Sequence, residues 1–92
     1  MYFNVLYHPN VKKDLAKINS KVGTQIKRAV ENRLRKSPEQ YGEPLRKTLK
    51  GYWKLRVGNY RIVFKINGNE IWILGIMHRK NVYKEVNRRK NY

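Results

Sequence analysis

The residues best suited to chemistry are basic side chains on two neighbouring segments in which apolar residues alternate. Lys54 and Arg56 lie in the first segment, Arg61 lies in the second, and Gly58-Asn59 separates them. A two-residue turn at that point pairs Arg56 with Arg61 and directs the three cations to one face of a sheet. Directly opposed arginines destabilise a sheet unless something separates or neutralises them, and a phosphate does both. The pattern therefore predicts an anion site, against the alternative of a solvated basic face that deters edge-to-edge aggregation.

The chemistry that such a site supports is cleavage of RNA, which carries its own nucleophile in the 2′-hydroxyl group. The protein then needs a base for that proton, an acid for the 5′-oxygen and cations around the crowded phosphorane. A lysine surrounded by other cations can lose its proton near neutral pH, which selects Lys54 as the base. Arginines hold phosphate oxygens bidentately, and a tyrosine can stack on a base or position the 2′-hydroxyl group. The candidate site residues are Lys54, Arg56, Arg61, His78, Arg79 and Tyr83.

Each candidate also has a plainer explanation. The lysine and the arginines can bind backbone phosphates without catalysis, His78 can be a hydrogen-bonded residue at a strand end, and Tyr83 can anchor the tail. No spacing here is as specific as a paired Cys-x-x-Cys metal motif, so the residues by themselves leave both explanations open.

Positive charge dominates the composition. The chain has 92 residues with 22 Lys and Arg against 6 Asp and Glu, a formal net charge of +16. Such a surface attracts polyanions, so we expect a nucleic-acid or ribonucleoprotein partner. The absence of cysteine excludes disulfides, thiolate metal sites and a cysteine nucleophile, and the single aspartate, Asp14, argues against a carboxylate metal site. No apolar run suits a membrane span and the first residues do not resemble a secretory signal, so we expect a cytoplasmic protein with no membrane partner.

The elements that must position these residues follow from hydrophobic periodicity. Alternation predicts strands over residues 2–8, 52–57, 60–66 and 70–77. Helical spacing predicts a first helix capped by Asn10 and a second over residues 20–36, which Ser37-Pro38 ends. Residues 39–51 are expected to be irregular, and residues 79–92 to form a short helix that frays into a basic end. The prediction is one α+β domain over residues 1–92, with an antiparallel sheet of about four strands, the order β-α-α-β-β-β and the helix pair on one face.

The open face of this sheet depends on the register of its last strand. Asn67-Gly68 is a second signal for a two-residue turn, which would pair Lys65 with Glu70 and place His78 on the same side as Arg61. Apolar residues of that strand would then share the open face, and the tail is the nearest element to cover them. These residues are Trp72, Leu74 and Ile76.

Two stretches resemble a known family. Residues 49–64, LKGYWKLRVGNYRIVF, resemble the block L-x-G-x-(aromatic)-(K/R)-(L/I)-(R/K)-x-G-x-Y-R-(V/I/L) of RelE/ParE-type toxins from type II toxin–antitoxin modules. Residues 78–83, HRKNVY, resemble the terminal H-R-x-x-x-Y block of the RelE-like, RNA-cutting branch. The resemblance covers nearly the whole chain and implies a compact fold similar to that of microbial ribonucleases.

The resemblance implies an activity and partners. RelE-like toxins enter the ribosomal A site and cleave the mRNA there without a metal or other cofactor, leaving a 2′,3′-cyclic phosphate and a 5′-hydroxyl end. The implied partners are the ribosome, through 16S ribosomal RNA and A-site mRNA, and an acidic RelB-like antitoxin. By the same resemblance Lys54 matches the general base, Arg61 the arginine that holds the phosphate, and Arg56 a second basic residue on the same strand.

The remaining candidates match the leaving-group side. Arg79 matches the arginine near the leaving oxygen and Tyr83 the tyrosine that stacks on mRNA, although only residues 80–82 separate them, fewer than in the best-known member. His78 sits where several relatives place a catalytic histidine that can share the acid role. Two other classes stay open: a ParE-like inhibitor of DNA gyrase that is not a nuclease, and an inactive relative that binds only RNA or its antitoxin.

Overall fold

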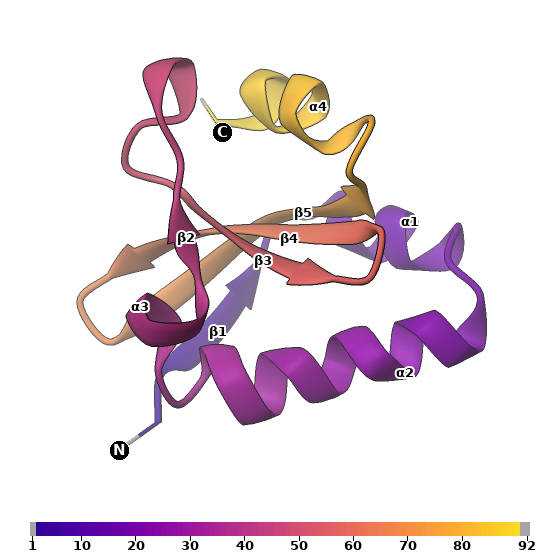
Figure 1. Cartoon of the computed structure of the whole chain (residues 1–92), viewed down its shortest axis with the longest axis horizontal. Coiled ribbons are helices and arrows are strands. Elements are labelled where there is room, and N and C mark those ends of the chain that lie inside the picture. The colour runs from indigo at the N-terminus through magenta and orange to yellow at the C-terminus, as the bar shows by residue number, and fades with distance from the viewer. Residues whose placement is uncertain (1, 91–92) are drawn as a thin grey trace.

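A five-stranded sheet organises the chain, and the computed structural model describes residues 2–90 (Figure 1). The strands lie in the spatial order β1-β5-β4-β3-β2. β1 pairs with β5 in parallel, whereas the other neighbouring strands are antiparallel. The strands are β1 (Asn4–Tyr7), β2 (Glu43–Pro44), β3 (Trp53–Val57), β4 (Tyr60–Asn67) and β5 (Glu70–His78).

The α+β class is confirmed, and two details of the predicted sheet are corrected. The sheet is mixed rather than wholly antiparallel, because the partner of β1 is β5 and no hairpin sets their relative direction. The region expected to be irregular, residues 39–51, contains the short strand β2, which adds a fifth strand beside β3.

Two helices cover one face of the sheet, as the sequence predicts. They are α1 (Val11–Ala16) and α2 (Ser20–Ala29), and α2 continues into η1, a π-helical turn over Val30–Leu34. Ile26 and Leu34 are fully buried against Ile62, Phe64 and Ile73 of the sheet. This apolar cluster is the larger part of the core and holds β3, β4 and β5 on the helix pair.

The ends of these helices are only partly as predicted. Asn10 stands at the start of α1 but makes no side-chain capping bond. The cap of α2 is Asn19, whose side chain accepts a hydrogen bond from Val22 N at 2.9 Å. After η1 comes a short helix, α3 (Pro38–Tyr41), which starts at the proline that was predicted to end the second helix. A 3₁₀ turn, η2 (Lys47–Leu49), precedes β3.

The opposite face of the sheet is covered by α4 (Val82–Arg89), which lies on the other side from α2 in Figure 1. Val82 and Val86 of this helix are fully buried against Val63 and Leu74. The tail therefore covers Leu74, as expected. Trp72 keeps 39% of its surface exposed, so α4 does not cover it fully.

The register of β4 and β5 differs from the prediction. Asn67 pairs with Glu70, and the turn residues are Gly68 and Asn69 rather than Asn67 and Gly68. The pairing also shifts by one residue where Val63 faces Gly75 and Phe64 faces Ile73. Such an extra residue in one strand reverses the faces of all residues beyond it.

Residues beyond that bulge lie on the face opposite to the one predicted. Ile76 is buried in the core beside α1 and α2, not on the α4 side, and His78 follows it. Met77 instead pairs with Arg61 and packs in the α4 cluster. The prediction that His78 shares the side of Arg61 is therefore wrong, and the β-bulge is the reason.

Candidate functional site

Lys54 and Tyr83 form the centre of the candidate site. Lys54 lies on β3, and its Nζ atom is 5.9 Å from the centroid of the Tyr83 ring in the first turn of α4. Both side chains are half-buried, so neither is fully wrapped by protein. The ammonium group over a phenol ring is a cation–π contact that holds the two residues together. The sequence-predicted base and the predicted stacking residue therefore meet across the sheet and α4.

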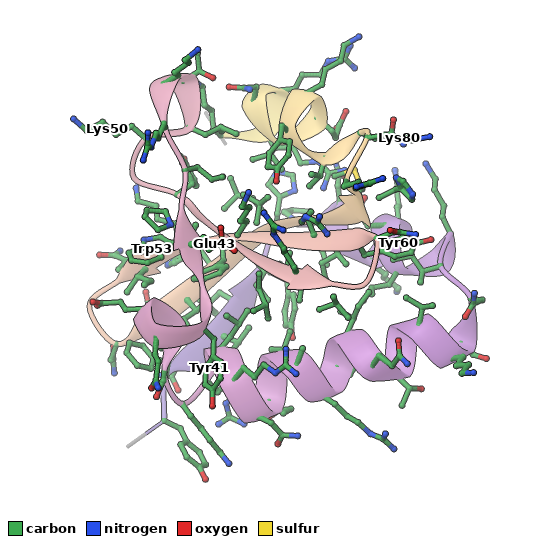
Figure 2. All side chains as sticks on the ribbon, viewed as in Figure 1. Tyr41, Glu43, Lys50, Trp53, Tyr60 and Lys80 are labelled. Carbon is green, nitrogen blue, oxygen red and sulfur yellow. The ribbon has the colours of Figure 1, made fainter. Side chains whose placement is uncertain are left out.

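Arg56 lies two residues further along β3, on the same face as Lys54. It is exposed, and its Nε atom is 3.5 Å from Glu43 Oε1. Glu43, labelled in Figure 2, comes from β2. In the strand pairing it stands directly opposite Lys54. This carboxylate is the site residue that sequence reasoning missed, because nothing in the irregular-looking segment 39–51 indicated a strand beside β3.

Arg61 is paired with Arg56 across the β3–β4 hairpin, as predicted. It is only 8% exposed, and its Nη1 atom donates hydrogen bonds to the carbonyls of Gly58 at 3.0 Å and Tyr60 at 2.9 Å. These bonds explain how two opposed arginines coexist, since one guanidinium turns back to satisfy the carbonyls of the turn. Arg61 thus both supports the hairpin and brings positive charge to the site.

Arg79 reaches the same hairpin from the loop between β5 and α4. Its backbone N–H donates to Asn59 O at 2.8 Å, and its side chain is exposed. The Arg61 side chain and the Arg79 backbone therefore both bond to the β3–β4 turn, next to the end of β3 that carries Arg56. Arg56, Arg61 and the Arg79 backbone thus adjoin this turn, whereas Lys54 and Tyr83 meet at the start of α4.

His78 is the sixth position, and it faces the other way. Its ring meets the Tyr60 ring edge-on, with centroids 5.8 Å apart, and its Nδ1 atom accepts a hydrogen bond from Lys80 N at 3.2 Å. Both rings line a cleft of about 610 Å³ with Lys17 and Lys80. Figure 2 labels Tyr60 and Lys80 near this end of the sheet.

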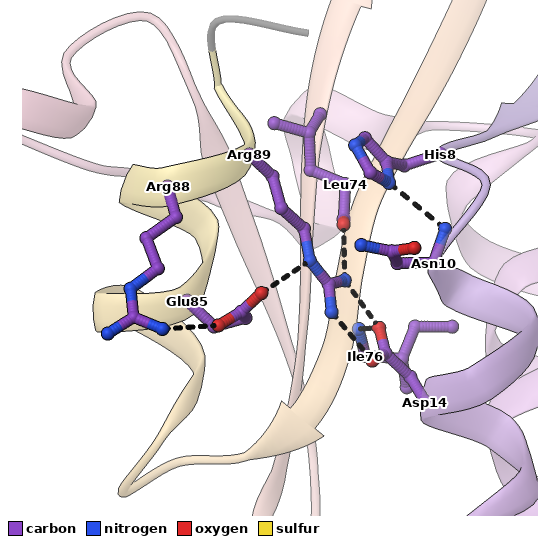
Figure 3. A network of polar contacts seen from close by, with 8 residues as sticks. All are labelled: His8, Asn10, Asp14, Leu74, Ile76, Glu85, Arg88 and Arg89. Atoms are coloured by element: carbon purple, nitrogen blue, oxygen red, sulfur yellow. Dashed lines mark hydrogen bonds and ion pairs between the residues drawn. The ribbon is translucent and has the colours of Figure 1, made fainter.

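A buried ion pair holds α4 over the site (Figure 3). Arg89 Nη1 and Nη2 donate to the two carboxylate oxygens of Asp14 at 2.7 and 2.9 Å, and Nη1 also donates to Leu74 O at 2.9 Å. Arg89 Nε donates to Glu85 at 3.1 Å. Above all, the hydrogen bond to Asp14 raises the pKa of the Arg89 guanidinium above its ordinary value. The pair joins the end of α4 to α1, and so restrains the helix that carries Tyr83.

Within residues 2–90 no three side chains of His, Cys, Asp or Glu come together in a way that could hold a metal ion. Among the same residues, no helix combines the length and the apolar character that crossing a bilayer requires.

The sequence and the fold of this chain have counterparts among toxins of type II toxin–antitoxin systems. The family model described as "ParE toxin of type II toxin-antitoxin system, parDE" matches residues 5–83. The chain therefore belongs to the RelE/ParE family of toxins.

Two curated relatives carry RelE-type names. The chain is 27% identical to Toxin RelG of Mycobacterium tuberculosis over 86 residues, which are 91% of this chain and 99% of that protein. It is 32% identical to Toxin RelE3 of Methanocaldococcus jannaschii over 82 residues, which are 86% of this chain and 93% of that protein.

Solved structures of the family share the architecture. The toxin–antitoxin complex RelBE2 of Mycobacterium tuberculosis contains a chain with a TM-score of 0.80 and 26% identity, covering 86% of this chain and 100% of that one. A mutant of E. coli toxin RelE in the free state gives a TM-score of 0.74 at 19% identity, covering 97% of this chain and 94% of that one, and shows the fold alone. Similar toxins have thus been solved both with an antitoxin and without one.

Proposed function

We propose that this toxin is a ribosome-dependent endoribonuclease that cleaves mRNA in the A site. The observation that carries the proposal is the position of Lys54 Nζ over the Tyr83 ring, with Arg56 on the same strand face and Arg61 opposite it. A base, a stacking surface and phosphate-binding cations then stand within one site of one domain, residues 1–92. RNA brings the nucleophile, so the site needs to supply only proton transfer and charge stabilisation.

The proposed reaction is an attack of the 2′-hydroxyl oxygen on the adjacent phosphorus. The neutral amine of Lys54 accepts the hydroxyl proton, the P–O5′ bond breaks, and the products are a 2′,3′-cyclic phosphate and a 5′-hydroxyl end. Arg56 and Arg61 bind the non-bridging oxygens as charge accumulates on them. Arg79, exposed on its loop, stabilises or protonates the leaving 5′-oxygen, and Tyr83 stacks on a base of the mRNA.

His78 has a separate place in this proposal. Its ring lies on the other face of the sheet, beside Tyr60, whereas the neighbouring Arg79 is bonded to the hairpin turn. A role for His78 as the acid requires substrate to reach around the end of β5, so we assign the leaving-group role to Arg79 first.

The proposed partners follow from charge. A net charge of +16 suits docking on 16S ribosomal RNA beside the A-site mRNA. It also suits an acidic RelB-like antitoxin, and two proteins of similar structure, the RelE toxins of Methanococcus jannaschii and Pyrococcus horikoshii, have been solved in complex with RelB. Both partners would be met in the cytoplasm.

The test is cleavage of a defined mRNA by the purified toxin, on programmed ribosomes and free in solution, with both product ends mapped. The proposal requires cuts within the A-site codon that end in a cyclic phosphate. The absence of cutting in both settings, by folded protein, would overturn it.

A second candidate is inhibition of DNA gyrase, and one finding favours it: the family model that matches residues 5–83 is named for ParE. A gyrase inhibitor needs no phosphate site, and the Arg61, Arg79 and Tyr83 set would then serve another purpose. A supercoiling assay with the same preparation separates the two functions, because a ParE-like toxin blocks supercoiling and leaves mRNA intact.

A further inference from the structure

A second cavity lies on the α4 side of the sheet, away from Lys54 and Tyr83. Its volume is about 210 Å³, roughly seven waters at the density of the liquid. Its lining includes Trp72 and Leu74 of β5, Lys65 of β4, Tyr52 just before β3, and the end of α4. Neither of the two central site residues contributes to it.

Two aromatic rings in this cavity are held by their polar atoms. Trp72 Nε1 donates to Glu70 Oε1 at 3.2 Å, and Tyr52 Oη donates to Lys90 O at 3.4 Å. With its polar atom engaged, the ring of Trp72 is the part of that side chain left for a ligand, while Lys65 Nζ lies 5.8 Å from the centroid of the Tyr52 ring. Trp72 in particular remains 39% exposed. Exposed aromatic faces of this kind are the surfaces on which unpaired bases stack.

The charge of the lining is positive. Of the described residues that line the cavity none is acidic, and three are Lys or Arg. Arg89 is committed to Asp14, and Lys90 Nζ donates to Thr48 O at 2.8 Å. Lys65 is exposed, pairs with Trp72 in the strand register, and places Nζ 5.8 Å from the Tyr52 ring. Lys65 is therefore the cation best placed for an incoming phosphate.

Tyr52 links this cavity to the candidate active site. It precedes Lys54 by two residues on the same side of the chain, which corresponds to about 7 Å along an extended strand. A single strand whose phosphate lies at Lys54 and Arg56 therefore has a neighbouring nucleotide within reach of the Tyr52 ring.

We propose that this cavity binds one unstacked nucleotide of single-stranded RNA. The base lies against Trp72 and Tyr52, and its phosphate contacts Lys65. The proposal deepens the proposed function by adding a substrate contact outside the reacting centre, but the binding itself does not depend on cleavage.

Trp72 fluorescence provides the direct readout. The chain has two tryptophans and seven tyrosines, so Trp53→Phe leaves Trp72 as the only tryptophan, and excitation beyond the tyrosine absorption band selects its emission. The probe is a hexauridylate with 2′-O-methyl groups, which cannot be cleaved by 2′-hydroxyl attack. We expect the oligonucleotide to quench the fluorescence of Trp72. In a separate measurement by the fluorescence anisotropy of a labelled oligonucleotide, Trp72→Ala should weaken binding at least about fivefold. Trp72→Phe retains a ring and should restore most of that loss.

Matched controls separate the cavity from the general surface charge. Tyr41 is another exposed aromatic residue, 47% exposed, on α3, and Tyr41→Ala should leave the affinity unchanged. Lys65→Gln should weaken binding and reduce its salt dependence, whereas Lys21→Gln on α2 should change both far less. Circular dichroism of each variant verifies the fold.

Several outcomes overturn the proposal. The first is that Trp72→Ala and the parent protein bind the oligonucleotide with equal affinity. The second is that an acidic peptide quenches the fluorescence of Trp72 and RNA does not. The proposed function is tested separately. If RNA quenches Trp72 fluorescence but no mRNA is cleaved, the proposed nuclease activity is refuted and the proposed nucleotide-binding cavity is retained. Conversely, if the protein cleaves mRNA and Trp72→Ala leaves KM unchanged, the nuclease activity is retained and the nucleotide-binding cavity is refuted.

Discussion

Arg89 and Asp14 lie 75 residues apart in the chain and form a bidentate ion pair in the interior. Their side chains are 8% and 6% exposed. Asp14 also accepts a hydrogen bond from Ile76 N at 3.1 Å, so the one aspartate of the chain joins α1, β5 and α4. Through this junction the last helix is held in the place where its first turn meets Lys54.

Neutralising Asp14 should therefore destabilise the fold strongly. Asp14→Asn keeps the shape and an oxygen acceptor but leaves the buried Arg89 charge with only the more exposed Glu85 carboxylate as a counter-ion. Breaking a buried pair in this way costs about 3–5 kcal/mol in the free energy of unfolding. Urea denaturation of the two proteins measures the difference.

Glu31→Gln is the matched control. Glu31 bonds Arg35 at 2.6 Å, a shorter distance than in the buried pair, but these side chains are 57% and 33% exposed. We expect a loss of at most about 1 kcal/mol. Equal losses for the two variants would mean that burial does not set the strength of the Asp14 pair.

The predictable parts of the fold are those with a local signal. The β3–β4 register followed from Gly58-Asn59, and Arg56 opposes Arg61 as expected. The β4–β5 register did not follow from Asn67-Gly68, because the turn slips by one residue and a bulge interrupts the pairing at Val63. Neither the shifted turn nor the bulge can be recognised from the alternation of apolar and polar residues.

The site was predictable to a similar extent. Lys54 and Tyr83 were both candidate residues, but their contact was not predicted, because nothing local to either residue indicates it. The face of His78 was not predictable, because it depends on the bulge several residues earlier. The position of Glu43 beside Lys54 could not be predicted either, because a two-residue strand has no periodicity and its place depends on pairing with β3.

Loss of the Lys54 amine should remove most of the proposed cleavage. A positioned general base contributes about 10²–10⁴-fold to the rate, so Lys54→Met, which keeps much of the aliphatic stem, should lower kcat on programmed ribosomes at least 100-fold by that measure. Lys21→Met on α2 removes an equal charge from an exposed position and should change the rate little. An undiminished rate for Lys54→Met would refute the assignment.

Arg61 should act on both stability and cleavage. Arg61→Ala removes two hydrogen bonds to turn carbonyls as well as a phosphate contact. We expect a loss of about 1–3 kcal/mol in unfolding free energy together with loss of mRNA cutting, while ribosome binding persists through the many other charges. Cutting at the parental rate by the folded variant would show that Arg61 is purely structural.

His8 should make stability depend on pH in one direction. Burial, reinforced by the Arg89 charge and opposed by Asp14 and Glu85, lowers the pKa of His8 below its ordinary 6.5. The folded chain then binds this proton more weakly than the unfolded chain, so its contribution to stability is complete above pH 6.5 and is lost as pH falls through the folded pKa. NMR titration of the ring measures the pKa directly. In urea denaturation at a series of pH values, His8→Gln should reduce the fall in unfolding free energy as the pH is lowered. The same pH profile for His8→Gln and the parent protein would contradict the assignment.

Two glycines should respond oppositely to alanine because their surroundings differ. Gly23 lies within α2 with nothing within 4 Å of an added Cβ, so Gly23→Ala should raise the free energy of unfolding by about 0.4–1 kcal/mol. At Gly42 the added Cβ would lie 2.8 Å from Pro38 O and 2.7 Å from Phe64 Cζ, a core side chain. Since neither neighbour can move freely, Gly42→Ala should cost about 1–3 kcal/mol. Chemical denaturation of both variants tests the pair, and stabilisation by Gly42→Ala would mean that β2 and α3 pack less tightly than the structure has them.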